Sequence, residues 1–308
     1  MSSLITTSHH PKTVGIIGLG LVGNALAYRL HQAGYGCVGF DINEQSRTKF
    51  EQPGFKSVSS IEEVLTLANT ILLTVYDTNG VIQVIEEILD FFKNPTVYTS
   101  SKHTHIIDCS TGDPKKLEDL SSKLSTLGLG IYFIEAPLSG SSLQIQEGTA
   151  TLLLGGEKSQ IENIKHVLDS IALSQVYVGK VGMAARAKLA TNLVLGLNRA
   201  ALAEGMVFAE KMGIDRKVFL DMILQTPARS EAASLKGEMM VNKKFEPQSR
   251  IRQHLKDVDL MIAAARSQGQ RLPLSETHAT LMKSAVNCGD GELDNAAIIR
   301  QIQREIIT

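Results

Sequence analysis

The stretch that decides the fold is VGIIGLGLVG, which runs from Val14 to Gly23. Its first residues are mostly aliphatic, as in a buried strand, and Val22 begins a stripe of apolar residues at helical spacing. The motif GxGxxG therefore stands between a strand and a helix, and it predicts a tight turn that joins the two.

Each glycine of this turn has its own physical reason. Gly18 permits the tight turn, Gly20 lacks the Cβ that would block a pyrophosphate, and Gly23 lets the helix pack closely on its strand. Free amides and the dipole at a helix N-terminus attract an anion, so we predict that the turn binds a dinucleotide. The predicted contacts are Gly18, Leu19, Gly20, Leu21, Val22 and Gly23. The motif alone also occurs in ordinary turns, and the strand and helix around it favour the dinucleotide.

Asp41 follows the next aliphatic run, Cys37 to Phe40, where a carboxylate can accept hydrogen bonds from the adenosine ribose hydroxyls. Its charge would repel a 2′-phosphate, which favours NAD over NADP as the cofactor. Arg47 lies nearby in the sequence and leaves NADP open. The alternative interpretation of Asp41 is an ordinary turn residue at a strand end.

From Thr13 to about Val178, short aliphatic runs alternate with longer amphipathic stretches. This alternation predicts repeated βαβ units around a parallel sheet with helices on both faces. The expected strands are Val14 to Ile17, Cys37 to Phe40, Ile71 to Val75, His105 to Asp108, Ile131 to Ile134, Ala150 to Leu154 and Val176 to Val178. The predicted class is α/β, with a Rossmann-type doubly wound sheet, and a surface loop is expected from Asn94 to His103.

After Gly182 the strand pattern stops, and a proline-free stretch from Met183 to Met212 predicts one long helix that joins two domains. Its expected buried face is Leu189, Leu193, Leu197, Ala200 and Ala201. Further helices are predicted at Arg216 to Gln225, Arg250 to Gln268, Leu274 to Asn287 and Asn295 to Glu305, with Asp215 as an N-cap and Pro273 in a first turn. We expect a flexible arm over residues 1–12, a dinucleotide-binding domain over 13–182 and an all-α domain over 183–308.

The composition narrows the classes of ligand. A chain of 308 residues, 43% hydrophobic and 20% charged, is long enough for two domains with sizeable cores. A net charge of −1 with interspersed signs predicts no nucleic acid and no membrane partner. The three cysteines and the histidines His103, His105, His254 and His278 lack metal-ligand spacing, so no metal site is expected, and no secretory signal is recognised. We therefore expect a cytoplasmic protein with a small-molecule substrate.

Three later segments carry polar residues where chemistry could occur. DCSTGDP runs from Asp108 to Pro114 at a strand end, and EAPLSGS runs from Glu135 to Ser141 at another. The third segment, GKVGMAARAKLATN, leads from Gly179 into the long helix and ends at Asn192. In their order and spacing these segments resemble the β-hydroxyacid dehydrogenases, the family that includes 3-hydroxyisobutyrate dehydrogenase and tartronate semialdehyde reductase.

The resemblance implies roles for the strand-end residues. It places Thr111 on the nicotinamide side of the cofactor, although a turn that only caps the next helix is the alternative. Val75 and Tyr76 fall where the family contacts the cofactor, and Tyr76 departs from the family's usual residue. Ser139, Gly140 and Ser141 resemble the substrate loop, and the alternative is a plain turn between two strands. Family members usually have a second glycine where this chain has Ser141, so the shape of the substrate is open.

The resemblance also implies that Lys188 is the general acid and base. Lys188 and Asn192 are four residues apart and share a helix face, so Asn192 is expected to orient the substrate. Arg186 should point elsewhere. In the family, the lysine of the KD pair, here Lys256, approaches the cofactor, and its charge would lower the pKa of Lys188 if the two are close. For both lysines, a solvated surface position is the alternative.

The resemblance implies reversible hydride transfer between NAD, or NADP, and a small β-hydroxy acid, by a homodimer or homotetramer. A 6-phosphogluconate dehydrogenase-like enzyme is the alternative within the fold. It would carry a histidine where this chain has Thr191, and it would be much longer. Related imine reductases commonly replace the lysine, which this chain retains. A dinucleotide-binding sensor or scaffold without turnover is the alternative outside the enzymes.

Overall fold

The computed structural model describes residues 12–93 and 103–305, in two compact units, Met1–Ala185 and Arg186–Thr308. The predicted arm therefore lies outside the described residues except for Lys12, and so does the predicted loop except for His103. The separation of the units falls inside the first turn of the long helix, whereas the prediction placed the domain boundary just before it.

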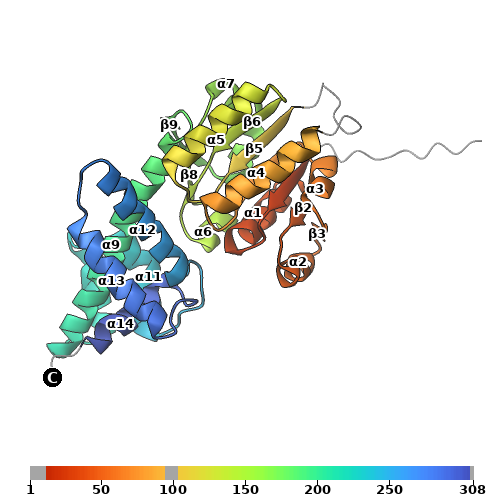
Figure 1. The fold of residues 1–308 in the computed structure, drawn as a ribbon. Coiled ribbons are helices and arrows are strands. Elements are labelled where there is room, and N and C mark those ends of the chain that lie inside the picture. The colour runs from red at the N-terminus through yellow and green to blue at the C-terminus, as the bar shows by residue number, and fades with distance from the viewer. Residues whose placement is uncertain (1–11, 94–102, 306–308) are drawn as a thin grey trace, which may run out of the picture. The chain divides into compact units, whose positions relative to one another are not determined.

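A single sheet organises the first unit (Figure 1). Among the described residues it has nine strands: β1 (Thr13–Ile17), β2 (Gly36–Phe40), β3 (Lys56–Ser57), β4 (Thr70–Leu73), β5 (Thr104–Asp108), β6 (Ile131–Glu135), β7 (Leu138–Ser139), β8 (Thr151–Gly155) and β9 (Ser174–Gly179). Their order is β3-β2-β1-β4-β5-β6-β8-β7, and β9 pairs with β8. The doubly wound α/β class is confirmed.

The sheet is mainly parallel, as expected, and departs from the βαβ pattern at one end. β8 runs antiparallel to both β6 and β7, whereas the pairs from β3 to β6 are parallel. The helix between β7 and β8, α6 (Ser142–Glu147), spans only about 9 Å, too little to carry the chain back along a neighbouring strand. β3 and β7 were not predicted, because two residues show no periodicity. β4 ends at Leu73, so Val75 lies in the turn beyond it.

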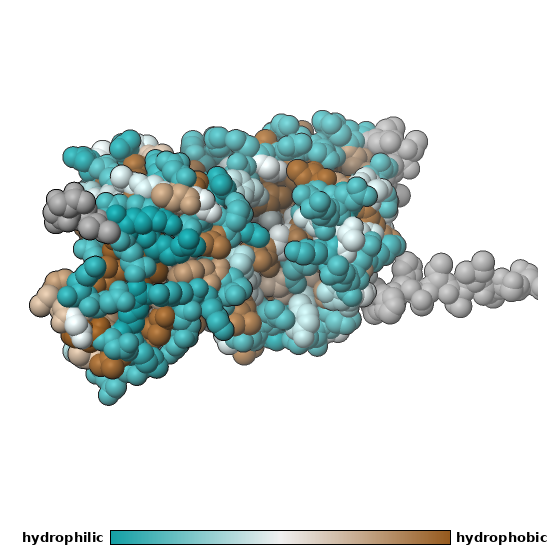
Figure 2. All heavy atoms as spheres, turned by 90° about the horizontal axis from the view of Figure 1, so that it is seen from below, coloured by the Kyte–Doolittle hydropathy of each residue, from teal (hydrophilic) through white to brown (hydrophobic). Residues whose placement is uncertain are grey.

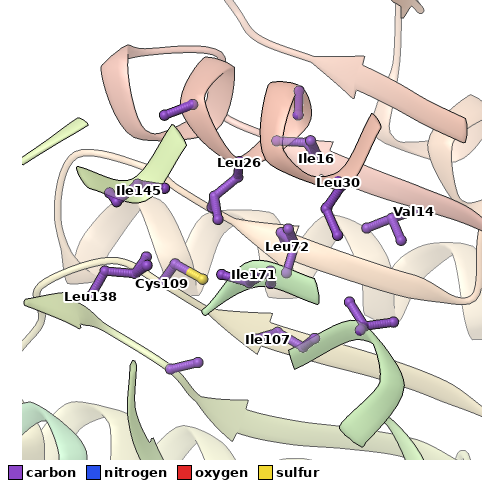
Figure 3. Close-up of a cluster of buried hydrophobic side chains, with 14 of the residues drawn as sticks. Val14, Ile16, Leu26, Leu30, Leu72, Ile107, Cys109, Leu138, Ile145 and Ile171 are labelled. Carbon is purple, nitrogen blue, oxygen red and sulfur yellow. The ribbon is translucent and has the colours of Figure 1, made fainter. Parts of the chain in front are cut away.

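Helices cover both faces of the sheet. They are α1 (Leu21–Gln32), α2 (Glu44–Glu51), α3 (Ile61–Leu67), α4 (Thr78–Lys93), α5 (Pro114–Leu127), α6, α7 (Lys158–Asn163) and α8 (Lys165–Ile171). Alternate residues of each strand enter opposite cores, so Ile16 packs with α1 and α8 while Ile17 packs with α3 and α4. Figure 3 shows the first of these cores, where Leu26 and Leu30 of α1 lie over the sheet.

The second unit is all helical among its described residues. Its helices are α9 (Met183–Lys211), α10 (Arg216–Gln225), α11 (Glu231–Asn242), α12 (Ile251–Ser267), α13 (Pro273–Asn287), a 3₁₀ turn (Asn295–Ala297) and α14 (Ile298–Arg304). The long helix, the Asp215 cap and the first-turn Pro273 are confirmed. α11 was not predicted, because Gly237 lowers helix propensity in its interior. That glycine is needed, since a Cβ there would collide with the Leu220 side chain.

The predicted buried face of α9 is confirmed at Leu189, which is buried, and is wrong at the later positions. Ala201 is exposed, and Leu193 and Leu197 are only half-buried. The buried positions of the helix include three polar residues, Lys188, Asn192 and Arg199, beside apolar ones such as Ala203 and Met206. The prediction followed the leucines, but in this helix polar side chains point to the interior together with apolar ones.

The surface is mostly polar on the face drawn in Figure 2, with hydrophobic residues in separate patches. Over residues 12–93 and 103–305, no helix has the length and apolar character needed to cross a membrane.

Candidate functional site

The glycine turn of the first unit has the geometry of an anion cradle. Gly18 has a φ of +98°, and a Cβ there would lie 2.6 Å from the carbonyl oxygen of Thr74. A Cβ at Gly23 would collide with the carbonyl oxygen of Gly18, whereas one at Gly20 would meet nothing within 4 Å. Two glycines are therefore required by packing, and the third leaves open space before the helix.

The start of α1 favours a negative ligand. Gly20 is its N-cap and supplies no side-chain hydrogen bond, and the first turn holds no acidic residue. No anionic side chain of the first turn therefore compensates the partial positive charge at the helix N-terminus. Together with the open space at Gly20, this fits the pyrophosphate of a dinucleotide. Contacts from Leu19, Leu21 and Val22 remain a prediction.

Asp41 supports the turn from the end of β2. Its carboxylate accepts hydrogen bonds from the Leu19 amide at 2.7 Å and from the Asn43 amide at 2.8 Å. Arg47 donates to the Asp41 carbonyl oxygen at 2.6 Å, so its guanidinium lies beside this strand end. Asp41 is thus a turn residue, as the alternative interpretation has it, and its carboxylate is held next to the predicted cofactor turn.

Hydrogen bonds connect the ends of neighbouring strands. Thr74 donates from Oγ1 to the Gly18 carbonyl oxygen, which fastens the glycine turn to the end of β4. The Val75 amide donates to Ser110 Oγ at 3.1 Å, and the Ser110 amide donates to Asp108 Oδ1 at 2.9 Å. Thr74 and Ser110 were missed as supporting residues, because their partners are more than 30 residues away in the sequence.

The residues predicted beside these turns differ in accessibility. Tyr76 is 51% exposed and Thr111 is half-buried. Asp113 accepts from the Lys115 and Lys116 amides and caps α5, so the segment from Asp108 to Pro114 does form a capping turn. Cofactor contacts by Val75, Tyr76 and Thr111 remain predictions.

The predicted substrate loop is a short strand followed by a helix cap. Ser139 ends β7, and Gly140 has no room for a side chain, since a Cβ would lie 2.9 Å from Cβ of Ala150. Ser141 forms a capping box with Gln144, in which each side chain accepts a hydrogen bond from the other residue's amide. The Ser141 hydroxyl therefore already has a structural role, and contact with a substrate stays a prediction.

In the second unit, Lys188 lies in a polar cluster between α9 and α12. It is only 7% exposed. Nearby, Asn192 Nδ2 donates to Asp257 Oδ2 at 3.1 Å, and Lys256 Nζ pairs with Asp257 Oδ1 at 3.1 Å. The structure thus brings together three of the predicted residues, Lys188, Asn192 and Lys256. It adds Asp257, to which no role was assigned, as their common partner.

Burial decides the ionisation of Lys188. Loss of solvent lowers its pKa to about 8, the charge of Asp257 opposes this shift, and the charge of Lys256 adds to it. Lys256 thus acts in the expected direction, but burial is the larger cause. Burial also raises the pKa of Asp257, against the attraction of Lys256 and Lys188. Arg186 is exposed, whereas Lys188 is buried.

The histidines are divided between surface and core. His254 and His278 are buried against α9, and burial lowers the pKa of both, that of His278 to about 4. His103 is exposed. Nowhere in the described ranges do three His, Cys, Asp or Glu side chains gather as metal ligands do.

The fold and the turn geometry define a Rossmann-type protein with a dinucleotide cradle. Comparisons with known proteins identify the family to which it belongs. A family model described as the NAD binding domain of 6-phosphogluconate dehydrogenase matches residues 13–179. A second, described as NAD-binding of NADP-dependent 3-hydroxyisobutyrate dehydrogenase, matches residues 182–302.

Individual relatives cover nearly the whole chain. The 2-hydroxy-3-oxopropionate reductase of Escherichia coli is 28% identical, over 94% of this chain and 97% of its own. The L-threonate dehydrogenase of Haemophilus influenzae is 27% identical, over 94% of either chain. A crystal structure of 3-hydroxyisobutyrate dehydrogenase from Salmonella typhimurium superposes with a TM-score of 0.82 at 24% identity, covering 94% of this chain and 99% of that one. The chain belongs to the β-hydroxyacid dehydrogenase family and is an NAD(P)-dependent oxidoreductase.

Proposed function

We propose that this protein interconverts a small β-hydroxy carboxylate and its carbonyl form, with Lys188 moving the proton. The observation that carries the proposal is a buried lysine whose pKa is lowered to about 8 beside Asn192 and Asp257. A general acid or base works best when its pKa lies near the working pH. In oxidation the neutral amine of Lys188 takes the proton of the substrate hydroxyl, and in reduction the ammonium returns it.

The other residues bind and orient. The turn from Gly18 to Gly23 would hold the pyrophosphate, and the Asp41 carboxylate would accept from the adenosine ribose hydroxyls, which favours NAD over NADP. When bound, the nicotinamide supplies the hydride acceptor or donor. Ser139, Gly140 and Ser141 offer amides and hydroxyls to the substrate carboxylate, and Asn192 orients the reacting hydroxyl.

Short hydroxy acids are the substrate class that these residues fit. Relatives are named for 2-hydroxy-3-oxopropionate and for L-threonate, both small oxygenated carboxylates. The 6-phosphogluconate alternative has less support, because the model for 3-hydroxyisobutyrate dehydrogenase matches the helical half that carries Lys188.

The experiment is an absorbance assay at 340 nm with 3-hydroxyisobutyrate, glycerate, threonate and 4-hydroxybutyrate, each with NAD and NADP. We expect turnover of at least one acid and none with the Lys188→Ala variant, whose affinity for NAD stays close to that of the wild type. Lys211→Ala, an exposed lysine of the same helix, is the matched control and should be fully active. Full activity of Lys188→Ala would overturn the role of Lys188. Thermal stabilisation by NAD without turnover of any acid would favour the dinucleotide-binding sensor.

We also propose a homo-oligomer, dimer or tetramer, assembled through the helical unit. Large apolar side chains of this unit are exposed, among them Phe208 on α9, Met212 directly after it and Leu274 on α13. Where such groups adjoin one another in a patch, they are typical of interfaces. Light scattering coupled to size exclusion measures the mass, and a monomer would contradict the proposal. The cytoplasmic location remains a prediction from the sequence.

A further inference from the structure

Glu135, the last residue of β6, is a buried acid to which the proposed reaction assigns no task. It is 1% exposed. Its Oε2 accepts hydrogen bonds from the Gly182 amide at 2.6 Å and the Ala184 amide at 3.2 Å, and its Oε1 accepts one from the Ala185 amide at 3.2 Å. These amides are at the start of α9, so one side chain caps a helix that begins 48 residues further along the chain.

The surroundings of Glu135 leave room for this carboxylate. Gly155 of β8 is its partner in the sheet, and a Cβ at that position would come within 2.6 Å of Oε2. On the other side, Asp108 of β5 stands in register with Glu135. The groups that face Glu135 are therefore a carboxylate, a glycine and the amides of α9.

The Glu135 carboxylate supplies hydrogen-bond acceptors for backbone amides at the start of α9. The first amides of any helix have no partner within the helix and carry a partial positive charge. Three of them at α9 share one carboxylate, and hydrogen bonds to a charged acceptor are stronger than those between neutral groups. Burial and the charge of Asp108 raise the pKa of Glu135 to about 7, against the three amides, which lower it.

Lys188 follows Ala184 by four residues on the same continuous helix, about one turn further on. Any tilt or fraying of the first turn therefore moves the lysine. We infer that Glu135 is a positioning residue for Lys188: it bonds the first amides of α9 to the end of β6 and so fixes the start of the helix that carries the lysine. This inference rests on the proposed role of Lys188.

The three hydrogen bonds from the amides of residues 182, 184 and 185 to Glu135 are called the anchor below. Protonation of Glu135 should weaken this anchor. A protonated carboxyl group has lost its negative charge, and its hydroxyl oxygen donates and is a weaker acceptor for an amide. Glutamine approximates this state at every pH, because it is uncharged and its NH₂ group cannot accept from an amide N–H. Loss of the anchor should lower kcat and not the affinity for NAD, since misplacing a reacting group by about 1 Å costs about 100-fold in rate.

The test compares Glu135→Gln with Glu157→Gln. Glu157 is the exposed N-cap of α7 and makes no side-chain cap hydrogen bond, so it is a matched acid without the anchor. For Glu135→Gln we expect kcat to fall about 10- to 100-fold, KM for NAD to stay within about twofold, and amide hydrogen exchange over residues 182–188 to rise. Glu157→Gln should change none of these.

The pH profile gives a second readout. In the reduction direction, where Lys188 must be protonated, wild-type kcat should fall as the pH drops below about 7, and Glu135→Gln should be low throughout. Glu135→Asp keeps the charge with a shorter reach and should retain more activity than Glu135→Gln. If Glu135→Gln does not fold, Glu135→Asp is measured in the same way, with smaller changes expected in the same direction.

The outcomes separate the two proposals. Wild-type kcat or wild-type exchange in the Glu135 variant overturns the positioning role, provided that Lys188→Ala is inactive. Full turnover by Lys188→Ala overturns the role of the lysine itself, whatever the exchange at residues 182–188 shows.

Discussion

Glu135 and Lys188 are both charged residues buried in the interior, and the groups around them differ. Burial moves both pKa values toward neutrality, that of Glu135 up to about 7 and that of Lys188 down to about 8. Glu135 is held by three backbone amides, whereas the pKa of Lys188 responds to the side chains of Asp257 and Lys256.

The difference indicates what each residue can do. Backbone amides neither titrate nor change sign, so they hold one carboxylate in one place. Asp257 and Lys256 act on Lys188 in opposite directions, which leaves burial as the main influence on its pKa. Glu135 thus has the surroundings of an anchor, and Lys188 those of a group that exchanges a proton.

Removing the anchor should have the largest effect on stability. Glu135→Ala leaves three buried amides without their acceptor, and we expect the free energy of unfolding to fall by about 3 kcal/mol. Urea denaturation followed by circular dichroism measures it. Glu157→Ala, at an exposed cap without a hydrogen bond, should stay within about 0.5 kcal/mol of the wild type. Equal losses in both variants would show that the three contacts of Glu135 contribute nothing.

Removing the buried cation Lys188 should instead raise the free energy of unfolding. At pH 7 Lys188 is protonated in a site that disfavours its charge, so Lys188→Met should raise the free energy of unfolding by about 2 kcal/mol. Because the folded pKa is lowered, the wild type bears this cost below about pH 8 and loses it as the pH rises toward 10.5.

The gain from Lys188→Met should therefore be smaller at pH 9.5 than at pH 7, as measured by urea denaturation at both values. Lys211→Met, at an exposed position of the same helix, should be neutral within about 0.5 kcal/mol. A loss of stability in Lys188→Met at pH 7 would contradict this prediction. It would mean that the interactions of the ammonium in the folded protein outweigh the cost of its burial.

The parts of this molecule that could be predicted from sequence are those with local signals. The glycine turn carries its strand, its turn and its helix within about 20 residues, and the structure has all three. The Asp215 cap and the long α9 were predicted for the same reason, since caps and helical spacing depend on near neighbours.

The parts that could not be predicted depend on distant partners. Glu135 meets amides about 47 to 50 residues away, and Asn192 meets Asp257 65 residues away. Hydrophobic spacing also misplaced part of the buried face of α9, because the interior there accommodates Lys188, Asn192 and Arg199. Periodicity assumes that buried residues are apolar, and a site for proton transfer breaks that assumption.

The smallest effects should come from the neighbours that tune Lys188. Asp257 raises the pKa of Lys188, so Asp257→Asn should lower it further. Lys256 lowers that pKa, so Lys256→Gln should raise it. Oxidation requires the neutral amine, and kcat for oxidation therefore rises with pH through the pKa of Lys188. At saturating substrate and cofactor, its midpoint should move to lower pH in Asp257→Asn and to higher pH in Lys256→Gln. Shifts in the same direction would contradict the electrostatic account, and an unmoved midpoint in both would indicate that another group titrates.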